Sequence, residues 1–352
     1  MSETELIKID GAAGEGGGQI LRSSLSLSLI TGKSLFITNI RAARKKPGLM
    51  AQHLTAVKAA ARISKASVEG AYLGSRQLHF KPGNVQSGRY IFKIKTAGAA
   101  TLVLQTVFVP LSLASSSSSV IITGGTHVQW SPCFDYLNFH WLPYLLEIGY
   151  DARMTLEQAG YYPKGGGRIN STIRPAVEIN SIDLLNRGRL KRITGISAVS
   201  NLPTSIAERQ KRQAQLRLLK LPWKGNNPNI RIKIERLRSI GKGTFIVILA
   251  EFEGGRSCFT SLGKLGKPAE RVADDAVDEL ISFIDSNGTI DPYLADQLIL
   301  PLSLASTPSR FITSCVTGHL LTNIDVTRAF LPIKIDVIGE RDHPGKVYIE
   351  PK

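Results

Sequence analysis

A repeated order of short sequence elements constrains the fold of this chain more than any other feature. Residues 110–115 and 301–306 both read Pro-Leu-Ser-Leu-Ala-Ser. Each copy follows an apolar run that is broken by one polar pair, Gln105-Thr106 in the first and Asp296-Gln297 in the second. Six shared letters can arise by chance, but the shared order of elements favours a repeated α/β unit.

A glycine turn that holds a histidine completes both copies. Strand-like residues 120–122 lead into Thr-Gly-Gly-Thr-His, which ends at His127, and residues 311–313 lead toward Thr-Gly-His, which ends at His319. Residues 19–38 form a looser third copy. We therefore expect an α/β fold in which one architectural unit recurs along the chain.

The secondary structure of residues 19–30 is ambiguous from the sequence. Leu25, Leu27 and Leu29 alternate with serines, which is the period of a strand. The same stretch follows a glycine-rich turn and is full of small residues, which suits a tightly packed helix. Periodicity leaves both alternatives open.

Residues 186–289 differ in character from the rest because they are richer in Lys and Arg. Clear patterns predict helices at 52–63, 206–219 and 268–285, and strands at 230–234 and 244–252. Since the repeat pattern resumes at Asp291, we predict a smaller α/β domain inserted into a larger one. The predicted bounds are 1–185 for the repeated units, 186–289 for the insert and 290–352 for the completion of the large domain.

The overall charge favours a polyanionic partner. The chain has 44 Lys and Arg against 28 Asp and Glu, a formal net charge of +16, so nucleic acid is the first candidate and a solubilising basic surface is the alternative.

The three cysteines lack metal-ligand spacing and do not suggest a disulfide framework. The first ten residues hold no apolar core of signal-peptide length, and the apolar run at 99–114 is shorter than the about 20 residues of a membrane span. We expect a soluble cytoplasmic protein without a membrane segment.

Two segments could bind phosphate groups. Residues 14–22 read Gly-Glu-Gly-Gly-Gly-Gln-Ile-Leu-Arg, and such glycines allow backbone to approach an anion closely. No Lys-Ser/Thr follows them, so this is not a Walker A loop, and an ordinary glycine turn with an exposed Glu15 is the alternative. Residues 41–46 carry four cations, among them Arg41 and Arg44, which suits either a phosphate clamp or a solvated basic loop.

Two further segments stand out. Residues 161–168 place a glycine triplet after an aromatic pair, which indicates either close backbone approach or a hairpin turn. His319 is one of six histidines, none of which has His-Glu-x-x-His spacing, so we expect no zinc site. A histidine can act as a nucleophile toward phosphorus, as a base or as a ligand.

Taken together, these segments resemble the RNA 3'-terminal phosphate cyclase family. The matching motifs lie in the same order and run nearly end to end apart from the insert. They are I-D-G-A-x-G-E-G-G-G-Q-I-L-R at 9–22, I-R-A-x-R-x-K-P-G-L at 40–49, Q-H-L-T-A-V-K-A-A at 52–60, T-L-V-L-Q-T at 101–106, Y-P-x-G-G-G at 162–167, Y-L-A-D-Q-L at 293–298 and H-L-L-T-N at 319–323. The chain departs from the family pattern at 127–130, where the family is more polar.

The resemblance implies a three-step reaction. His319 would attack the α-phosphorus of ATP and expel pyrophosphate, AMP would pass to an RNA 3'-phosphate end, and the neighbouring 2'-OH would displace AMP to close a 2',3'-cyclic phosphate. Adenylation turns a poor leaving group into AMP, and the adjacent hydroxyl makes closure intramolecular. Mg²⁺ would bridge phosphate oxygens.

Roles for individual residues are also implied. The catalytic group would contain His319, Glu15 and Arg22, with Glu15 as the metal ligand. The ATP-binding residues would be Gln105, Pro132, Tyr293, Asp296 and Gln297, and the residues that bind phosphates or the RNA end would be Arg41, Arg44 and Gln52.

The resemblance further implies three repeats similar to the C-terminal domain of translation initiation factor 3, with one inserted α/β domain, and it favours a helix for residues 19–30. The oligomeric state stays open, with a homodimer as one candidate. Two alternatives are a non-catalytic cyclase-like protein of ribosome assembly, whose relatives lack the histidine at this motif, and an enolpyruvyl transferase, which would not explain the H-L-L-T-N motif.

Overall fold

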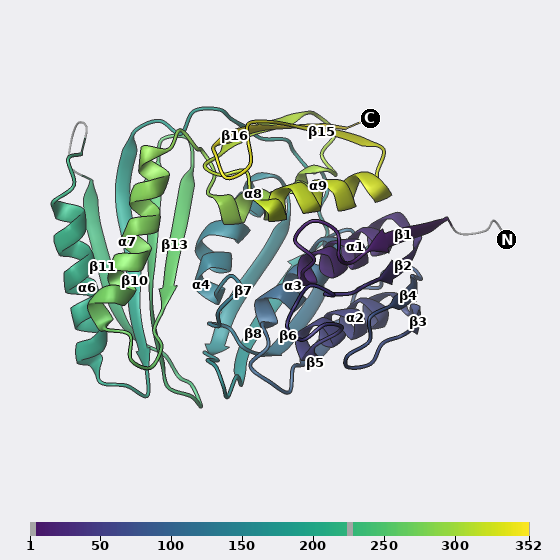
Figure 1. Ribbon diagram of the computed structural model, residues 1–352, viewed down its shortest axis with the longest axis horizontal. Helices are drawn as coiled ribbons and strands as arrows, with labels where there is room; N and C mark the ends of the chain where they lie inside the picture. Colours follow the sequence, from purple (N-terminus) through teal and green to yellow (C-terminus); the bar gives the residue numbers. More distant parts are fainter. Residues whose placement is uncertain (1–4, 224–227, 352) are drawn as a thin grey trace.

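The computed structural model describes residues 5–223 and 228–351, and within them it contains four small mixed sheets of four strands each. Helices accompany every sheet (Figure 1). The chain therefore has the α/β class predicted from the sequence. Among the described residues, no helix combines the length and apolarity needed to cross a membrane.

Three of the sheets share one topology, which we call the first, second and third units. In each unit, two parallel strands are extended on one side by two antiparallel strands. The strand orders are β1-β2-β4-β3, β5-β6-β8-β7 and β9-β14-β16-β15. A helix follows each of the first two strands of a unit, so the repeated unit expected from the sequence is confirmed.

The elements of these units are as follows. The first unit comprises β1 (Leu6–Asp10), α1 (Gly18–Thr31), β2 (Ser34–Thr38), α2 (Ala51–Ser64), β3 (Ser67–Glu69) and β4 (Leu78–Lys81). The second comprises β5 (Arg89–Lys93), α3 (Ala100–Ser112), β6 (Ser118–Gly124), α4 (Phe134–Tyr136), the π-helix η1 (Leu137–Trp141), α5 (Leu142–Glu147), β7 (Asp151–Gln158) and β8 (Gly167–Arg174). The third comprises β9 (Asp183–Leu184), α8 (Pro292–Leu302), β14 (Ser309–Thr313), α9 (Gly318–Phe330), β15 (Ile333–Ile338) and β16 (Gly345–Pro351).

The fourth sheet interrupts the third unit between β9 and α8, and we call its elements the inserted unit. They are β10 (Leu190–Ser200), α6 (Thr204–Leu219), β11 (Asn229–Arg236), β12 (Gly243–Phe252), β13 (Arg256–Leu262) and α7 (Ala269–Asp285), with strand order β11-β10-β12-β13. Alternate residues of β12 divide between two cores. Phe245 and Val247 join the main core, while Ile246 and Ile248 join the separate core beneath α6 and α7. The domain bounds at 185 and 289 stay a prediction.

Residues 19–30 form most of α1, so the period-two alternative is wrong and the helix implied by the resemblance is confirmed. The alternation carries no strand signal because the serines between the leucines are buried too. Ser24 and Ser28 are fully buried, and Ser26 donates a hydrogen bond to the Thr106 carbonyl of α3 at 2.8 Å. A helix packed on several sides by α2, α3 and α9 loses the polar face that marks an amphipathic helix.

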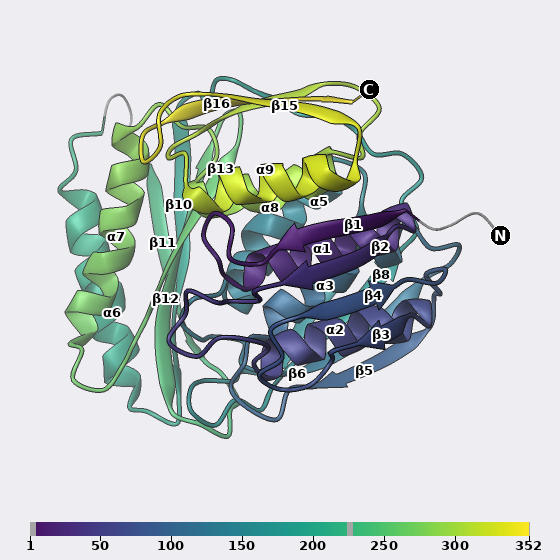
Figure 2. The ribbon, with the colours of Figure 1, turned by 45° about the vertical axis from the view of Figure 1, so that its right-hand side comes forward.

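The shared sequence Pro-Leu-Ser-Leu-Ala-Ser begins in the last turn of two equivalent helices. Pro110 lies inside the last turn of α3, and Pro301 lies inside the last turn of α8. The predicted helices and strands elsewhere are present at the expected places, with α2, α6 and α7 covering the three helix patterns. In Figures 1 and 2 the helices of the three units lie together, with their sheets outside them. This packing brings loops from different units together at the helix ends.

Candidate active site

His319 lies in the first turn of α9, immediately after the glycine that begins the helix. Thr317 is the N-cap, and its Oγ1 accepts the backbone N–H of Leu320 at 3.1 Å. The imidazole is exposed to solvent. A helix N-terminus presents free N–H groups and a partial positive charge, so an anionic substrate is favoured at this position.

The glycine-rich loop of the first unit packs directly against this turn. A Cβ on Gly318 would lie 2.1 Å from Glu15 Oε1, and a Cβ on Gly14 would lie 2.2 Å from Thr322 Oγ1. The Glu15 N–H also donates to Thr322 Oγ1 at 3.2 Å. Glycine at these two positions permits the loop to seat on α9, which places the Glu15 carboxylate beside the histidine.

Three arginines surround the pair. Arg44 donates to the Glu15 carbonyl at 3.1 Å, and Arg341, from the loop between β15 and β16, lies 3.4 Å from Glu15 Oε1. Arg22 belongs to α1, and its charge reaches the histidine. The structure thus places Glu15 and Arg44 near His319 and brings the charge of Arg22 to bear on it, while the roles of these residues stay a prediction.

The pKa of His319 lies below its ordinary value of 6.5. Desolvation of the ring by neighbouring protein atoms is the largest cause, because it disfavours the charged imidazolium. The Glu15 carboxylate raises the pKa, whereas the positive charges of Arg22 and Arg44 lower it. The ring is therefore neutral at pH 7, with a lone pair free to attack an electrophile.

A second polar group links α1 to α8. Gln19 donates to Asp296 Oδ2 at 3.1 Å, and burial raises the pKa of Asp296 to about 7, against the opposing effects of Gln19 and Arg22. Burial lowers the pKa of Arg22 to about 10, and Asp296 opposes that shift. Arg22 is therefore a desolvated cation whose charge acts on the pKa of both Asp296 and His319.

The predicted ATP-binding amides form one chain of contacts. Gln105 donates to Gln297 Oε1 at 2.6 Å, and Gln297 donates to the Tyr293 carbonyl at 2.6 Å. The Tyr293 ring is exposed, with its hydroxyl 3.4 Å from Glu279 Oε1. Gln105 of α3 thus reaches the start of α8, the helix that carries Tyr293, Asp296 and Gln297.

Two further predicted residues, Arg41 and Gln52, have hydrogen-bond partners within the protein, and a third, Pro132, lies on a turn. Arg41 Nη1 donates to the carbonyls of Lys46 and Gly48 at 2.7 and 2.8 Å, so these bonds stabilise the loop to which Arg41 itself belongs. Gln52 accepts the N–H of Ala99 at 2.8 Å and so fixes the start of α3. Pro132 lies on the turn between β6 and α4. A phosphate or ATP contact of Arg41, Gln52 or Pro132 stays a prediction.

Sequence reasoning missed two neighbours of the site. His53, at the start of α2, lies against Gly18, where a Cβ would be 2.3 Å from its Nε2. Burial, with help from Arg22 and Arg41, lowers the pKa of His53 to about 3. His53 lies in the motif Q-H-L-T-A-V-K-A-A at 52–60, shortly after the basic residues at 41–46, and this position was a usable signal in the sequence. Arg341 had none, because it meets Glu15 only through the packing of two distant units.

The arrangement suits attack on phosphorus. It combines a neutral imidazole, a neighbouring carboxylate and several cations at a helix N-terminus, and these groups can hold a polyphosphate while the ring nitrogen forms a bond. The first unit supplies Glu15, Arg22 and Arg44, and the third unit supplies His319 and Arg341.

Comparison with known proteins gives a consistent result. The family described as "RTC: RNA 3'-terminal phosphate cyclase" matches residues 13–337. The chain is 40% identical over 339 residues to the RNA 3'-terminal phosphate cyclase of Gloeothece citriformis, covering 94% of this chain and 95% of that protein. It is 42% identical over 332 residues to that of Nostoc punctiforme (92% and 94% covered) and 40% identical over 337 residues to that of Salmonella agona (96% and 95% covered).

Among solved structures, EPSP synthase from Acinetobacter baumannii aligns with 99% of this chain and 65% of its own length, at 12% identity and a TM-score of 0.28. That score is too low to support a conclusion about fold or function. The family match and the near-complete coverage of named relatives are decisive: the chain belongs to the RNA 3'-terminal phosphate cyclase family.

Proposed function

We propose that this chain is an ATP-dependent RNA 3'-terminal phosphate cyclase that works through a covalent adenylate on His319. Membership of the family supports the overall reaction, in which ATP and an RNA 3'-phosphate give a 2',3'-cyclic phosphate, AMP and pyrophosphate. The observation that carries the histidine's role is its place in the structure: an exposed, neutral imidazole at a helix N-terminus, flanked by Glu15 and Arg44.

In the first step, a lone pair of the His319 ring forms a bond to the α-phosphorus of ATP, and the bond to pyrophosphate breaks. Arg22 and Arg44 stabilise negative charge on the phosphate oxygens, and the Glu15 carboxylate stabilises the positive charge that the ring acquires when it is phosphorylated. The lowered pKa of the ring keeps its nitrogen unprotonated before attack.

In the second step, an RNA 3'-phosphate oxygen attacks the histidine-bound phosphorus, the histidine leaves, and RNA-(3')pp(5')A forms. In the third, the vicinal 2'-OH attacks the RNA phosphorus, releases its proton to solvent and expels AMP. Closure gains from proximity, because the hydroxyl and the phosphorus belong to one nucleotide. Arg41 and Gln52 would orient the RNA end.

The nucleotide would lie along the start of α8. The exposed Tyr293 ring and Pro132 would enclose the adenine, with Gln105, Asp296 and Gln297 beneath it. Mg²⁺ fits the residues present, since Mg²⁺ commonly uses one or two carboxylates with phosphate oxygens. Glu15 would hold the ion, which would neutralise charge on the phosphates. A cytoplasmic location and a fold similar to the C-terminal domain of initiation factor 3 in each unit are further parts of this proposal. A non-catalytic cyclase-like protein of ribosome assembly is the alternative to it.

The test is covalent labelling. The protein is incubated with α-labelled ATP and Mg²⁺ and separated on a denaturing gel. We expect acid-labile, alkali-stable label in the parent protein and no label in His319→Asn. The control variant His79→Asn, which lies on β4 in the sheet of the first unit, should keep the label. Loss of at least about 1,000-fold is expected when a nucleophile is removed. Label that survives in His319→Asn contradicts the assignment; absence of label from every variant, without cyclisation of an RNA 3'-phosphate, favours the non-catalytic alternative.

A further inference from the structure

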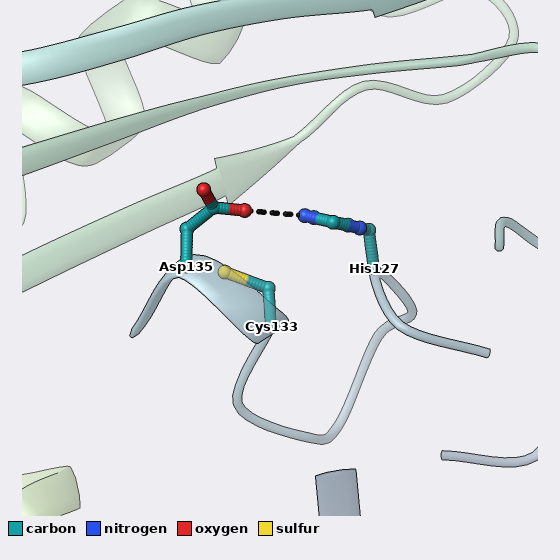
Figure 3. A group of neighbouring side chains, drawn as sticks. All are labelled: His127, Cys133 and Asp135. Atoms are coloured by element: carbon teal, nitrogen blue, oxygen red, sulfur yellow. Dashed lines mark hydrogen bonds and ion pairs between the residues drawn. The ribbon is translucent and has the colours of Figure 1, made fainter. Parts of the chain in front are cut away.

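A second cluster of reactive side chains lies in the second unit, on the turn between β6 and α4. His127 stands near the start of this turn, Cys133 ends it as the N-cap of α4, and Asp135 lies in α4 (Figure 3). One ligand atom from each of the three residues lies within 4.8 Å of the other two, and all three residues are buried. The proposed reaction at His319 uses none of them.

The donor set selects a class of metal. An imidazole nitrogen, a thiolate sulfur and a carboxylate oxygen together suit zinc and similar borderline ions, whereas Mg²⁺ and Ca²⁺ take oxygen ligands. Metal–ligand bonds of about 2.0 to 2.3 Å separate tetrahedral donors by roughly 3.3 to 3.8 Å. The group is thus within small side-chain rotations of a ligand geometry. His127 Nε2 now lies 2.7 Å from Asp135 Oδ2, so this contact would widen as an ion enters.

The surroundings orient the histidine for such a role. Its Nδ1 lies 2.9 Å from Thr126 Oγ1, and that oxygen accepts the N–H of Gly160 at 2.9 Å. Metal-binding histidines commonly have their second ring nitrogen held by a hydrogen bond, which fixes the ring and leaves the first nitrogen aimed at the ion. The ring also stacks on Phe245 of β12, with centroids 4.2 Å apart.

The inserted unit therefore closes one side of the cluster. Phe245 belongs to the face of β12 that packs into the main core, and Tyr161 lies with its centroid 5.5 Å from that of His127. The low exposure of Cys133 (2%) and Asp135 (6%) excludes bulk water from the three donors. Three protein ligands leave a fourth tetrahedral position, which a single water molecule can fill.

We propose that His127, Cys133 and Asp135 bind one zinc-class divalent ion, which ties the two ends of the turn between β6 and α4 together. Binding releases the thiol proton to solvent as the sulfur–metal bond forms. It also requires the remaining ring proton to lie on Nδ1, from which it donates to Thr126 Oγ1. A water molecule completes the four ligands. The three ligands follow one another in the sequence with the spacing His-x5-Cys-x-Asp.

The ion would rigidify the turn that carries Pro132 and Trp130. Trp130 is 96% exposed and has a positive φ of 65°, a conformation in which a bulky side chain is strained. A metal bond at each end would hold such a loop in one conformation. This inference does not depend on the proposed cyclase activity, because metal binding is measured without ATP or RNA.

The test uses Co²⁺ as a spectroscopic substitute for zinc. Protein stripped with a chelator is titrated with Co²⁺, and we expect about one ion per chain, a sulfur-to-cobalt charge-transfer band in the near ultraviolet and intense tetrahedral bands in the visible, all removed by added Zn²⁺. Elemental analysis after desalting gives the zinc stoichiometry, and the thermal midpoint rises with zinc.

Variants assign the ligands. Cys133→Ser is expected to lose the charge-transfer band and the thermal shift, while Cys258→Ser, the other buried cysteine, and Glu15→Gln retain both. Circular dichroism of each variant in chelator shows that it is folded. Absence of a thiolate band in the parent protein overturns the proposal, as does a band that persists in Cys133→Ser or one that is lost in Cys258→Ser.

Discussion

The second and third units each carry a histidine between their second strand and the end of the next helical turn, and the two histidines have different surroundings. In the second unit Thr123 and Gly124 end β6 and His127 follows them, whereas in the third unit Thr317 caps α9 and His319 lies in the first turn of that helix. His127 is buried, stacked on Phe245 and bonded to Asp135. His319 is exposed, with the Glu15 carboxylate beside it and Arg44 nearby. The chemistry of a histidine here is thus decided by what a neighbouring unit brings to the turn.

Different partners produce the contrast. In the second unit, β12 of the inserted unit covers the turn and removes the histidine from solvent. In the third, the glycine loop of the first unit approaches from one side and leaves the ring open. A repeat therefore supplies positions for reactive groups, while the packing between units selects which position can react.

The largest difference is expected in stability when each histidine is truncated. His127→Ala leaves the buried Asp135 carboxylate without its partner and opens a cavity, so the free energy of unfolding should fall by about 3 to 5 kcal/mol. His319→Ala should change it by less than about 0.5 kcal/mol. Urea unfolding of chelator-treated protein measures both. Equal losses in the two variants would remove the structural distinction between the turns.

The glycines of the two turns should differ next. A Cβ on Gly125 would lie 2.4 Å from the Ala97 carbonyl oxygen, which is backbone and cannot move cheaply. Gly125→Ala should therefore lower the unfolding free energy by about 1 to 3 kcal/mol. A Cβ on Gly318 would meet the flexible Glu15 side chain instead.

Gly318→Ala should consequently change stability by less than about 1 kcal/mol, yet displace Glu15. Self-adenylation should slow by on the order of 10- to 100-fold, because small misplacements in a reactive site are costly. Thermal melting and single-turnover labelling separate the two effects. A Gly318→Ala variant that is unstable but fully active would contradict this division.

Much of the fold was predictable because its signals are local. The structure contains the elements that these signals predicted. The shared six-residue sequence lies at the ends of α3 and α8, the helix patterns at 52–63 and 268–285 correspond to α2 and α7, and the basic stretch at 186–289 contains the inserted unit. The buried α1 was not predictable from periodicity, since its serines bond to backbone inside the core and its leucines face more than one neighbour. Only the family resemblance indicated a helix there.

The site was predictable to a smaller extent. Motifs identified Glu15, Arg44 and His319, but nothing local indicated that Arg341 pairs with Glu15 or that Arg41 bonds to its own loop. The cluster around His127 was also missed, since its ligand spacing follows no common pattern and its burial depends on the inserted unit. Contacts between units far apart in the sequence leave no periodic signal.

A smaller effect is expected from the cap of α9. Thr317 Oγ1 accepts the Leu320 N–H, whereas in the second unit Cys133 Sγ accepts the Tyr136 N–H at 3.4 Å. Thr317→Ala should lower the unfolding free energy by about 1 kcal/mol, and Thr317→Ser should restore most of it. Urea unfolding tests the pair. If serine is no better than alanine, the hydroxyl does not cap the helix that carries His319.

The finest test concerns the titration of His319. Its pKa lies below 6.5, so the ring is neutral at pH 7 and becomes protonated only as the pH falls through the lowered value. Self-adenylation should therefore be constant near neutral pH and decline on the acid side, because a protonated ring has no lone pair for phosphorus. The same shift destabilises the fold in acid, since the unfolded chain binds the proton more tightly.

Two variants test the charges that act on the His319 ring. Glu15→Gln should lower the pKa of His319 further by removing a favourable charge, and Arg44→Ala should raise this pKa toward 6.5. Proton NMR titration of the free protein measures the order Glu15→Gln, parent, Arg44→Ala. The reverse order would show that the charges which distinguish this turn from that of His127 do not act on the ring.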